Sequence, residues 1–244
     1  MNLDYFHIIL LSTLFILVLL SLTSHYILVK ALKHQELLRA DLRSKLLRKR
    51  LDPHFIGNLL QSLVGLFYRG KKEQIGTVIQ EYASLVKHNF EVLELDNISL
   101  EEEVKFLLRY LYTRNLMSEV QIHYELRLSI YTPTQELYVP AMLLQPILEN
   151  ALNHGLHGNK APHIILEFKI TENLRVRIID NGPGMNVGAM DKSKGSLNLT
   201  IERLKLLNKM STESFSFQFL DDLSEYGITQ GCGVELNLPI LKEL

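Results

Sequence analysis

ILENALNHG, residues 147–155, is the segment on which the prediction of the fold rests. Glu149 and Asn153 are four residues apart and therefore share one face of a helix. The same spacing separates Asn150 from His154. A carboxylate beside carboxamides can hold Mg²⁺ with its waters and present them to phosphates. A solvated helix face would show the same residues, so a second motif is needed to decide.

The second motif lies at the end of an expected strand, LRVRIID at residues 174–180. Asp180 closes the strand and is followed by Asn-Gly-Pro-Gly-Met, in which Gly182 and Gly184 let the backbone turn tightly and approach a ligand. A buried carboxylate at a strand end can accept a hydrogen bond from an exocyclic amine. On its own, the run DNGPG would also fit an ordinary turn.

The order of the two motifs, with the helix first and the strand end next, resembles the GHKL ATP-binding fold of gyrase, Hsp90, MutL and histidine kinases. The resemblance implies that ATP and Mg²⁺ bind here, that Asn150 holds the metal ion and that Glu149 orients the chemistry. It also implies that Asp180 and its glycines contact adenine. The cofactor-binding residues expected in this way are Asn150, Asn153, His154, Asp180, Gly182, Gly184, Lys194 and Gly195.

The last two of these residues belong to KGSLNLTIERLKLL, residues 194–207, which matches the next glycine box of the family and its helix. Here the chain departs from the family pattern. Where the family usually shows a GxGLxN-like run, this chain has Lys-Gly-Ser-Leu-Asn-Leu, and one glycine remains. Lys192 and Lys194 could meet phosphate charge, although exposed lysines in a loop are more often merely solvated.

A third motif is LDPHFIGNLLQSL at residues 51–63. It resembles the NPHFLFNxLNSI signature of LytS/YehU-type sensor histidine kinases. Pro53, His54, Phe55 and Asn58 match that signature, whereas Asp52, Ile56 and Gly57 do not. An imidazole with a pKa of about 6.5 is substantially neutral in the cytoplasm and can attack a phosphoryl group. The catalytic residues expected from the resemblance are His54, Asn58 and Glu149.

The remaining pattern predicts an α+β protein whose main domain is a two-layer α/β sandwich of GHKL (Bergerat) type. Helical spacing on either side of the turn RGKK at residues 69–72 predicts a helical hairpin, and Ser99 with Glu102 forms a capping box for the next helix. Alternating runs such as FSFQF at residues 215–219 predict half-buried strands. Helices after Pro140 and from Ser196 should cover one face of a mixed sheet.

An apolar run near the N-terminus predicts a membrane span. From Tyr5 to Val29 there is no Asp, Glu, Lys or Arg, and about 20 such residues cross a hydrocarbon core. A cleaved signal peptide would have a basic start and a small-x-small cleavage site. The N-terminal sequence MNLDYFH shows neither clearly. Eight Lys or Arg residues follow between Lys30 and Arg50, so the C-terminal part is expected in the cytoplasm, and no outside sensor domain is expected.

Size and charge restrict the alternatives. The 244 residues allow one main domain with extra helices, and the net charge of -1 argues against direct nucleic-acid binding. A lone cysteine, Cys232, fits a reducing compartment. The expected parts are a transmembrane helix (1–30), a helical linker with the dimerisation and phosphoacceptor hairpin (31–95), and the ATP-binding domain with its leading helix (96–244).

These features lead to the hypothesis of a single-pass sensor histidine kinase in the cytoplasmic membrane. It would autophosphorylate from ATP and pass the phosphoryl group to an aspartate of a response regulator, which in the family commonly has a LytTR-type DNA-binding domain. A homodimer is expected, because in-line attack needs His54 close to the bound phosphate. The alternative is a membrane-anchored pseudokinase that acts as a dimeric scaffold, which the altered glycine box and Gly57 beside His54 favour.

Overall fold

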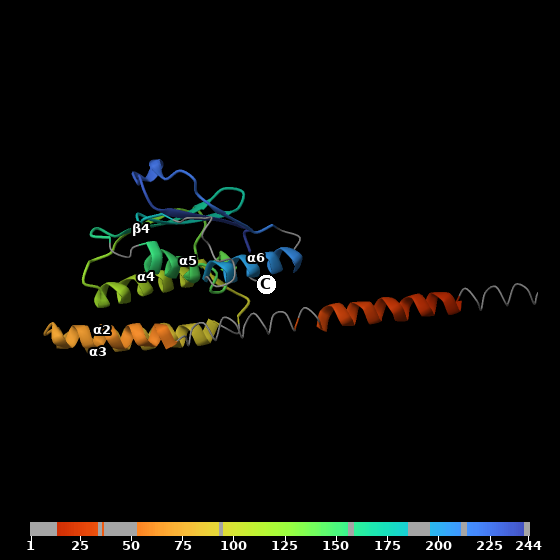
Figure 1. Ribbon diagram of the computed structural model, residues 1–244. Coiled ribbons are helices and arrows are strands. Elements are labelled where there is room, and N and C mark those ends of the chain that lie inside the picture. The colour runs from red at the N-terminus through yellow and green to blue at the C-terminus, as the bar shows by residue number, and fades with distance from the viewer. Residues whose placement is uncertain are drawn as a thin grey trace, which may run out of the picture. The chain divides into compact units, whose positions relative to one another are not determined.

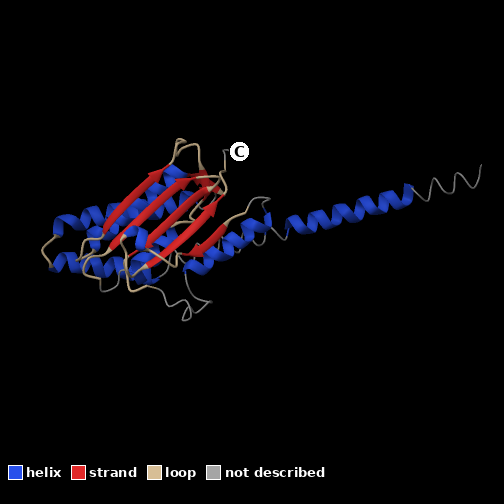
Figure 2. Ribbon diagram, turned by 90° about the horizontal axis from the view of Figure 1, so that it is seen from above, coloured by secondary structure: helices blue, strands red, loops and turns tan. Residues whose placement is uncertain are grey.

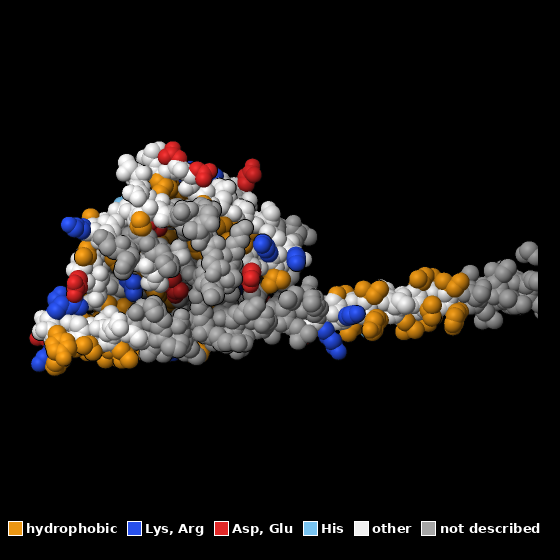
Figure 3. All heavy atoms as spheres, in the orientation of Figure 1, with side chains coloured by type: hydrophobic (Ala, Val, Ile, Leu, Met, Phe, Trp, Pro, Cys, Tyr) orange, Lys and Arg blue, Asp and Glu red, His pale blue; other side chains and the backbone are white. Residues whose placement is uncertain are grey.

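The computed structural model describes residues 14–33, 36, 53–92, 95–155, 159–184, 196–210 and 214–241. The chain divides into two compact units, Met1–Asp52 and Pro53–Leu244. In the first unit, the helix Leu14–Lys33 has 20 residues and a mean hydropathy of 1.9. Its apolar side chains are exposed all along the helix, as the orange spheres in Figure 3 show. Among the described residues it is the one helix long and apolar enough to cross a membrane.

The second unit begins with a helical hairpin. Helix α2 (Pro53–Tyr68) and helix α3 (Lys72–Glu91) are joined by a tight turn in which Gly70 has a φ of 74°. Glycine adopts this left-handed backbone conformation without steric cost. The turn predicted at RGKK is therefore confirmed. The helical run ends near Val92, a little earlier than expected. The helix predicted between Lys33 and Pro53 lies outside the described residues, apart from residue 36.

Helix α4 (Leu100–Met117) begins with the capping box predicted from the sequence. The Ser99 hydroxyl accepts a hydrogen bond from the Glu102 N–H at 3.2 Å, and the Ser99 N–H donates to the Glu102 carboxylate at 3.3 Å. Two short strands, β1 (Asn97–Ser99) and β3 (Tyr138–Pro140), pair in antiparallel fashion beside it. Neither strand was predicted, because three residues are too few to establish an alternating pattern.

Five longer strands form a mixed sheet, which Figure 2 shows with the helices beneath it. The strands are β2 (His123–Ser129), β4 (His163–Ile170), β5 (Leu174–Asp180), β6 (Ser216–Phe219) and β7 (Cys232–Leu238). Their order is β2-β4-β5-β7-β6, with β2 parallel to β4 and every other pair antiparallel. The expected two-layer α/β sandwich with a mixed sheet is therefore confirmed.

The helical layer consists of α4, α5 (Gln145–Asn150) and α6 (Ser196–Met210), and α5 continues as a π-helix, η2 (Ala151–Gly155) (Figure 1). The prediction of a helix from Pro140 is wrong at its start, because the helix begins only at Gln145. Pro146 lacks an N–H and is tolerated only in the first turn. In the turn before the helix, Met142 takes a φ of 64°, a strained value for a residue with a side chain.

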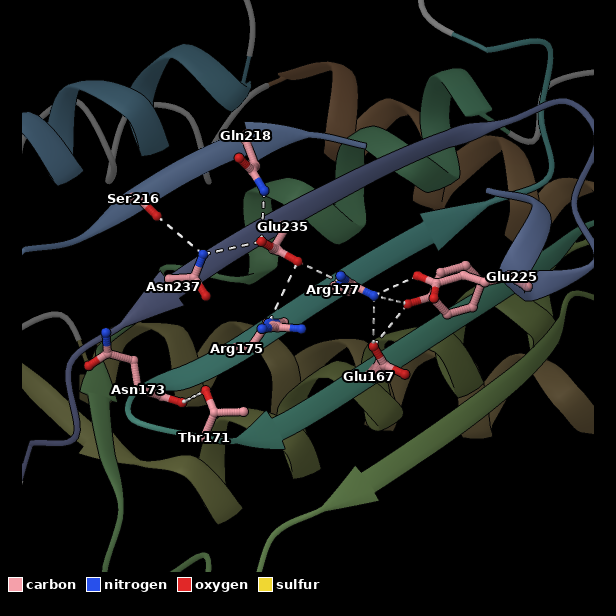
Figure 4. A network of polar contacts seen from close by, with 11 residues as sticks. Glu167, Thr171, Asn173, Arg175, Arg177, Ser216, Gln218, Glu225, Glu235 and Asn237 are labelled. Carbon is pink, nitrogen blue, oxygen red and sulfur yellow. Dashed lines mark hydrogen bonds and ion pairs between the residues drawn. The ribbon is translucent and has the colours of Figure 1, made fainter. Parts of the chain in front are cut away.

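The two faces of the sheet have different chemistry. Ile164, Phe168, Val176 and Ile178 are buried on the helix side, and alternation places Asp180 on the same side. The opposite face carries the polar network drawn in Figure 4. There Arg177 Nε lies 2.6 Å from Glu235 Oε2. Part of that face is covered by the β6–β7 loop with the 3₁₀-helix η4 (Ser224–Tyr226). The buried cluster beneath this loop consists of Ile165, Ile179, Leu223 and Ile228.

Candidate functional site

The end of strand β5 buries a carboxylate. Asp180 is 3% exposed, and its Oδ1 accepts a hydrogen bond from the Gly182 N–H at 2.9 Å. Burial raises the pKa of Asp180 from 3.8 to about 6, while hydrogen bonds from the backbone of Gly182 and Cys232 act in the opposite direction. Near neutral pH the group is therefore a charged acceptor held inside the domain.

Two loops pack backbone against backbone around this carboxylate. A Cβ atom on Gly231 would lie 2.0 Å from the Asp180 carbonyl oxygen, a distance that real Cβ atoms essentially never show. Gly184 has a φ of 80°, and a Cβ there would lie 3.2 Å from the Gly231 carbonyl oxygen. The Gln230 Nε2 group donates to the Pro183 carbonyl at 2.9 Å. Gly231 thus helps to build the strand end, and sequence reasoning missed it.

The other half of the site is the helix α5–η2. Glu149 and Asn150 are the last residues of α5, and Asn153 and His154 lie in the π-helix. The buried Gln145 side chain donates to Glu149 Oε1 at 2.7 Å, which fixes the carboxylate. Because η2 contacts β5, the fold brings the two sequence motifs to the same region.

Neighbouring elements hold both ends of α5–η2. At its start, the buried Glu103 carboxylate of α4 accepts a hydrogen bond from the Leu144 N–H at 3.0 Å. The guanidinium of Arg203, on α6, donates to the Ala141 carbonyl. At its end, Arg114 Nη2 donates to Asn153 Oδ1 at 3.2 Å. Side chains of α4 and α6 therefore position the helix that carries Glu149.

The helical hairpin lies against the same region through α4. Arg109 Nη1 donates to the Ser84 hydroxyl at 2.7 Å, and its Nε lies 3.4 Å from a Glu81 oxygen. The His88 and Phe106 rings stack with centroids 5.0 Å apart. Burial and the nearby Glu149 charge raise the pKa of Tyr82 on α3 from 10.0 to about 12. The hairpin is thus close enough to Glu149 for Tyr82 to respond to its charge.

Several of the predicted site residues cannot be placed in full. His54 and Asn58 lie in α2 and His154 in η2, and their side chains are outside what the structure describes. Lys194 and Gly195 lie outside the described residues altogether. Within the described residues there is no group of three or more His, Cys, Asp or Glu side chains that could hold a metal ion.

Residues 42–122 match the family model for histidine kinase. Over 150 residues the chain is 25% identical to Sensor protein kinase HptS of Staphylococcus aureus, a match that covers 62% of this chain and 28% of the relative. The same figures apply to this protein from several strains of the organism. The chain therefore spans less than a third of the length of these curated relatives.

Solved structures of histidine kinases also align with this chain. AdeS of Acinetobacter baumannii covers 79% of this chain and 98% of its own, with a TM-score of 0.44 and 14% identity. The histidine kinase domain of a blue-light activated kinase from Erythrobacter litoralis covers 82% and 96%, with a TM-score of 0.42 and 16% identity. Because these TM-scores are below 0.5, the resemblance rests on the sequence matches alone. The sequence matches confirm the resemblance to LytS/YehU-type sensor histidine kinases: residues 42–122 match the histidine kinase family model, and the chain is similar to sensor protein kinase HptS over 150 residues.

Proposed function

We propose that this chain is a membrane-anchored sensor histidine kinase that autophosphorylates on His54 from ATP. The observation that carries the proposal is the buried Asp180 carboxylate, which the Gly182 N–H holds at the end of β5, beside η2 of the ENALNHG motif. A charged acceptor in such a position suits the exocyclic amine of adenine. Gly182, Gly184 and Gly231 supply backbone without side chains, so a flat base can approach closely.

The phosphates would lie along α5–η2. Asn150 would hold Mg²⁺ through its amide oxygen, and Glu149, fixed by Gln145, would orient the reacting groups. Asn153 and His154 would contact the phosphates, as would Lys194 and Gly195 of the glycine box. Mg²⁺ would neutralise charge on the phosphates as the phosphoryl group is transferred.

The reaction at His54 is an in-line displacement. A neutral ring nitrogen of His54 attacks the γ-phosphorus, the bond to the bridging β–γ oxygen breaks, and ADP leaves with the bond electrons. Asn58, one turn after His54 on α2, would orient the imidazole by a hydrogen bond. The phosphoryl group then passes to an aspartate of a response regulator, for which a LytTR-type protein is the expected class.

A second copy of the chain would pair with the first through the helical hairpin. Leu60, Val64 and Phe67 are exposed and recur every three to four residues on α2, so they form an apolar stripe along one face. In Figure 3 apolar side chains gather over the hairpin at the lower left. Pairing of two hairpins would bury these stripes in a homodimer. The division at residues 1–30, 31–95 and 96–244 fits this arrangement and remains a prediction.

The helix Leu14–Lys33 supports a single span of the cytoplasmic membrane. The Lys and Arg residues that follow it support a cytoplasmic location for the rest of the chain, where ATP is available.

The proposal is tested with the full-length chain in lipid nanodiscs and γ-labelled ATP with Mg²⁺. We expect an acid-labile, alkali-stable label that His54→Gln removes. The matched control is His88→Gln, because His88 lies on the neighbouring helix of the hairpin, with its ring stacked on Phe106. This control should keep the label. A purified receiver domain added afterwards should take the label up.

A label that persists in His54→Gln would contradict the assignment of the phosphoacceptor. Nucleotide binding without any label in the parent chain would instead support the alternative, a dimeric pseudokinase scaffold.

A further inference from the structure

A pocket of about 450 Å³ opens beside the phosphate end of the candidate site. Its lining comes from three parts of the fold that are far apart in sequence: Ser62 on α2, Arg114 at the end of α4, and Lys160 in the segment before β4. Leu152 of η2 lies in the same wall. The pocket therefore lies between the helix that carries His54 and the helix that carries Glu149.

The charge around this pocket is predominantly positive. Its one lining carboxylate, Glu119, forms an ion pair with Arg69 at 3.0 Å. Arg114 and Lys160 have no acidic partner among the described residues. An anion that enters the pocket would therefore meet two cations whose charge is not already compensated.

Arg114 is also tied to the ENALNHG motif. Its Nη2 donates to Asn153 Oδ1 at 3.2 Å, which fixes the direction of the guanidinium. A guanidinium has five N–H donors, so most of them stay available for a second acceptor. The described side chains of the motif itself, Glu149, Asn150 and Asn153, include no cation, although transferring phosphoryl groups are commonly held by one.

We propose that Arg114 and Lys160 form the binding site for the terminal phosphate of the nucleotide. This inference rests on the proposed function and adds to it the phosphate-binding residues. A bidentate guanidinium–phosphate contact would distinguish ATP from ADP, because only ATP has a phosphate that reaches this pocket. Since Ser62 lies about two helical turns after His54 on α2, the same pocket also adjoins the phosphoacceptor helix.

The test measures the affinities of ATP and ADP, each with Mg²⁺, by calorimetry on the full-length chain in nanodiscs. We expect Arg114→Ala to weaken ATP binding by roughly tenfold or more and ADP binding by less than about threefold, because a charge-assisted contact to the last phosphate is lost. Arg114→Lys should recover part of the loss, and Lys160→Ala should show a smaller effect of the same kind. Lys105→Ala removes a cation from the same helix outside the pocket and should change neither affinity.

Three outcomes would overturn the inference. Equal loss of ATP and ADP affinity in Arg114→Ala would mean that Arg114 only holds Asn153. Unchanged affinities would mean that its charge is merely solvated. Loss of the ATP preference in Lys194→Ala, with Arg114→Ala unaffected, would place the cation in the glycine box instead.

A parent chain that binds neither nucleotide would overturn the proposed function itself. The pocket is then tested separately by adding inorganic phosphate and measuring the broadening of its ³¹P resonance. Broadening that Arg114→Ala abolishes would support an anion site that binds free phosphate, and broadening that is equal in both proteins would overturn it.

Discussion

The two halves of the candidate site are built in different ways. Asp180 belongs to the middle of the sheet, paired with Ile164 on one side and Cys232 on the other, and is 3% exposed. The helix half consists of the six-residue helix α5 and the π-helical turn η2, and Asn153 there is exposed. The strand end is thus fixed by backbone pairing within the sheet. The helix half is held by apolar packing of Ile147, Leu148 and Leu152 together with hydrogen bonds from α4 and α6.

The largest effect is expected from Gly231→Ala, which disturbs the strand end around Asp180. The new methyl group would lie 2.0 Å from the Asp180 carbonyl oxygen, and this contact can be relieved only by moving β5 or β7. We expect a loss of about 3 kcal/mol in unfolding free energy, the upper end for an overpacked site, together with loss of nucleotide binding. Urea unfolding measures the first and calorimetry the second.

The control is Gly76→Ala on α3, where a Cβ meets no heavy atom within 4 Å. Helix propensity should make this variant more stable by roughly 0.5–1 kcal/mol. Equal stability of the two alanine variants would show that the strand end is less rigid than described.

The next effect concerns the charge of Asp180. Its pKa is about 6 in the folded chain and 3.8 ordinarily, so between these values the unfolded state binds fewer protons than the folded state. The contribution of Asp180 to stability therefore falls as the pH rises from about 4 to about 6, by about 3 kcal/mol in total, and then stays constant. Asp180→Asn does not titrate, so its stability relative to the parent should rise over this range.

Unfolding curves of the ligand-free parent and Asp180→Asn from pH 4 to pH 8 measure this difference. A difference that does not change with pH would contradict a buried, charged carboxylate. The same variant should bind nucleotide more weakly at pH 7, because its amide is uncharged and keeps only one acceptor oxygen, which the Gly182 N–H already uses.

A smaller effect is expected in the helix half of the site from Gln145→Leu. The variant keeps the buried volume but loses the donor at 2.7 Å from Glu149. We expect labelling of His54 to slow by about tenfold, with nucleotide affinity within about twofold, since a single hydrogen bond to a charged group is lost. The control is Gln135→Leu, which removes a similar hydrogen bond from a Gln side chain to a carboxylate, the exposed 3.0 Å bond to Glu101. This variant should leave the rate of labelling unchanged. Equal rates in all three proteins would refute the role of Gln145.

The smallest effect is expected at the contact between the hairpin and α4. Arg109→Ala removes an exposed ion pair and a hydrogen bond, so the free energy of unfolding should fall by no more than about 1 kcal/mol. Amide hydrogen exchange in α3 should nevertheless become faster, because the hairpin is then held less firmly. Lys105→Ala removes only an ion pair within α4 and should not change that exchange. Unaltered exchange in Arg109→Ala would mean that apolar packing alone holds the hairpin.

The features that could be predicted from sequence are local ones. The capping box needs only Ser99 and Glu102, the hairpin turn needs Gly70, and alternation along β5 places Asp180 at its end. Each depends on neighbours within a few residues, so a pattern in the sequence contains the whole signal.

The features that were missed depend on contacts between distant segments. Gly231 matters because β7 lies against the Asp180 carbonyl, and Arg114 matters because α4 ends beside η2. Nothing in the residues around either position indicates these contacts. The late start of α5 had a local signal in Pro146, but the apolar run before it, Ala141–Leu144, also fits a helix. The site residues of α2 and of the glycine box remain predictions.

The pairing of Asp180 with Cys232 also gives the molecule an internal reporter. Burial and the adjacent Asp180 charge raise the pKa of the Cys232 thiol to about 12, so almost none of it is thiolate while β5 and β7 stay paired. Alkylating reagents react with the thiolate, and the sequence contains no other cysteine. The rate of alkylation of the unmodified chain therefore reports on the surroundings of this partly exposed thiol at the strand end. A ligand that binds across the strand end will protect Cys232 in proportion to its occupancy, without any engineered label.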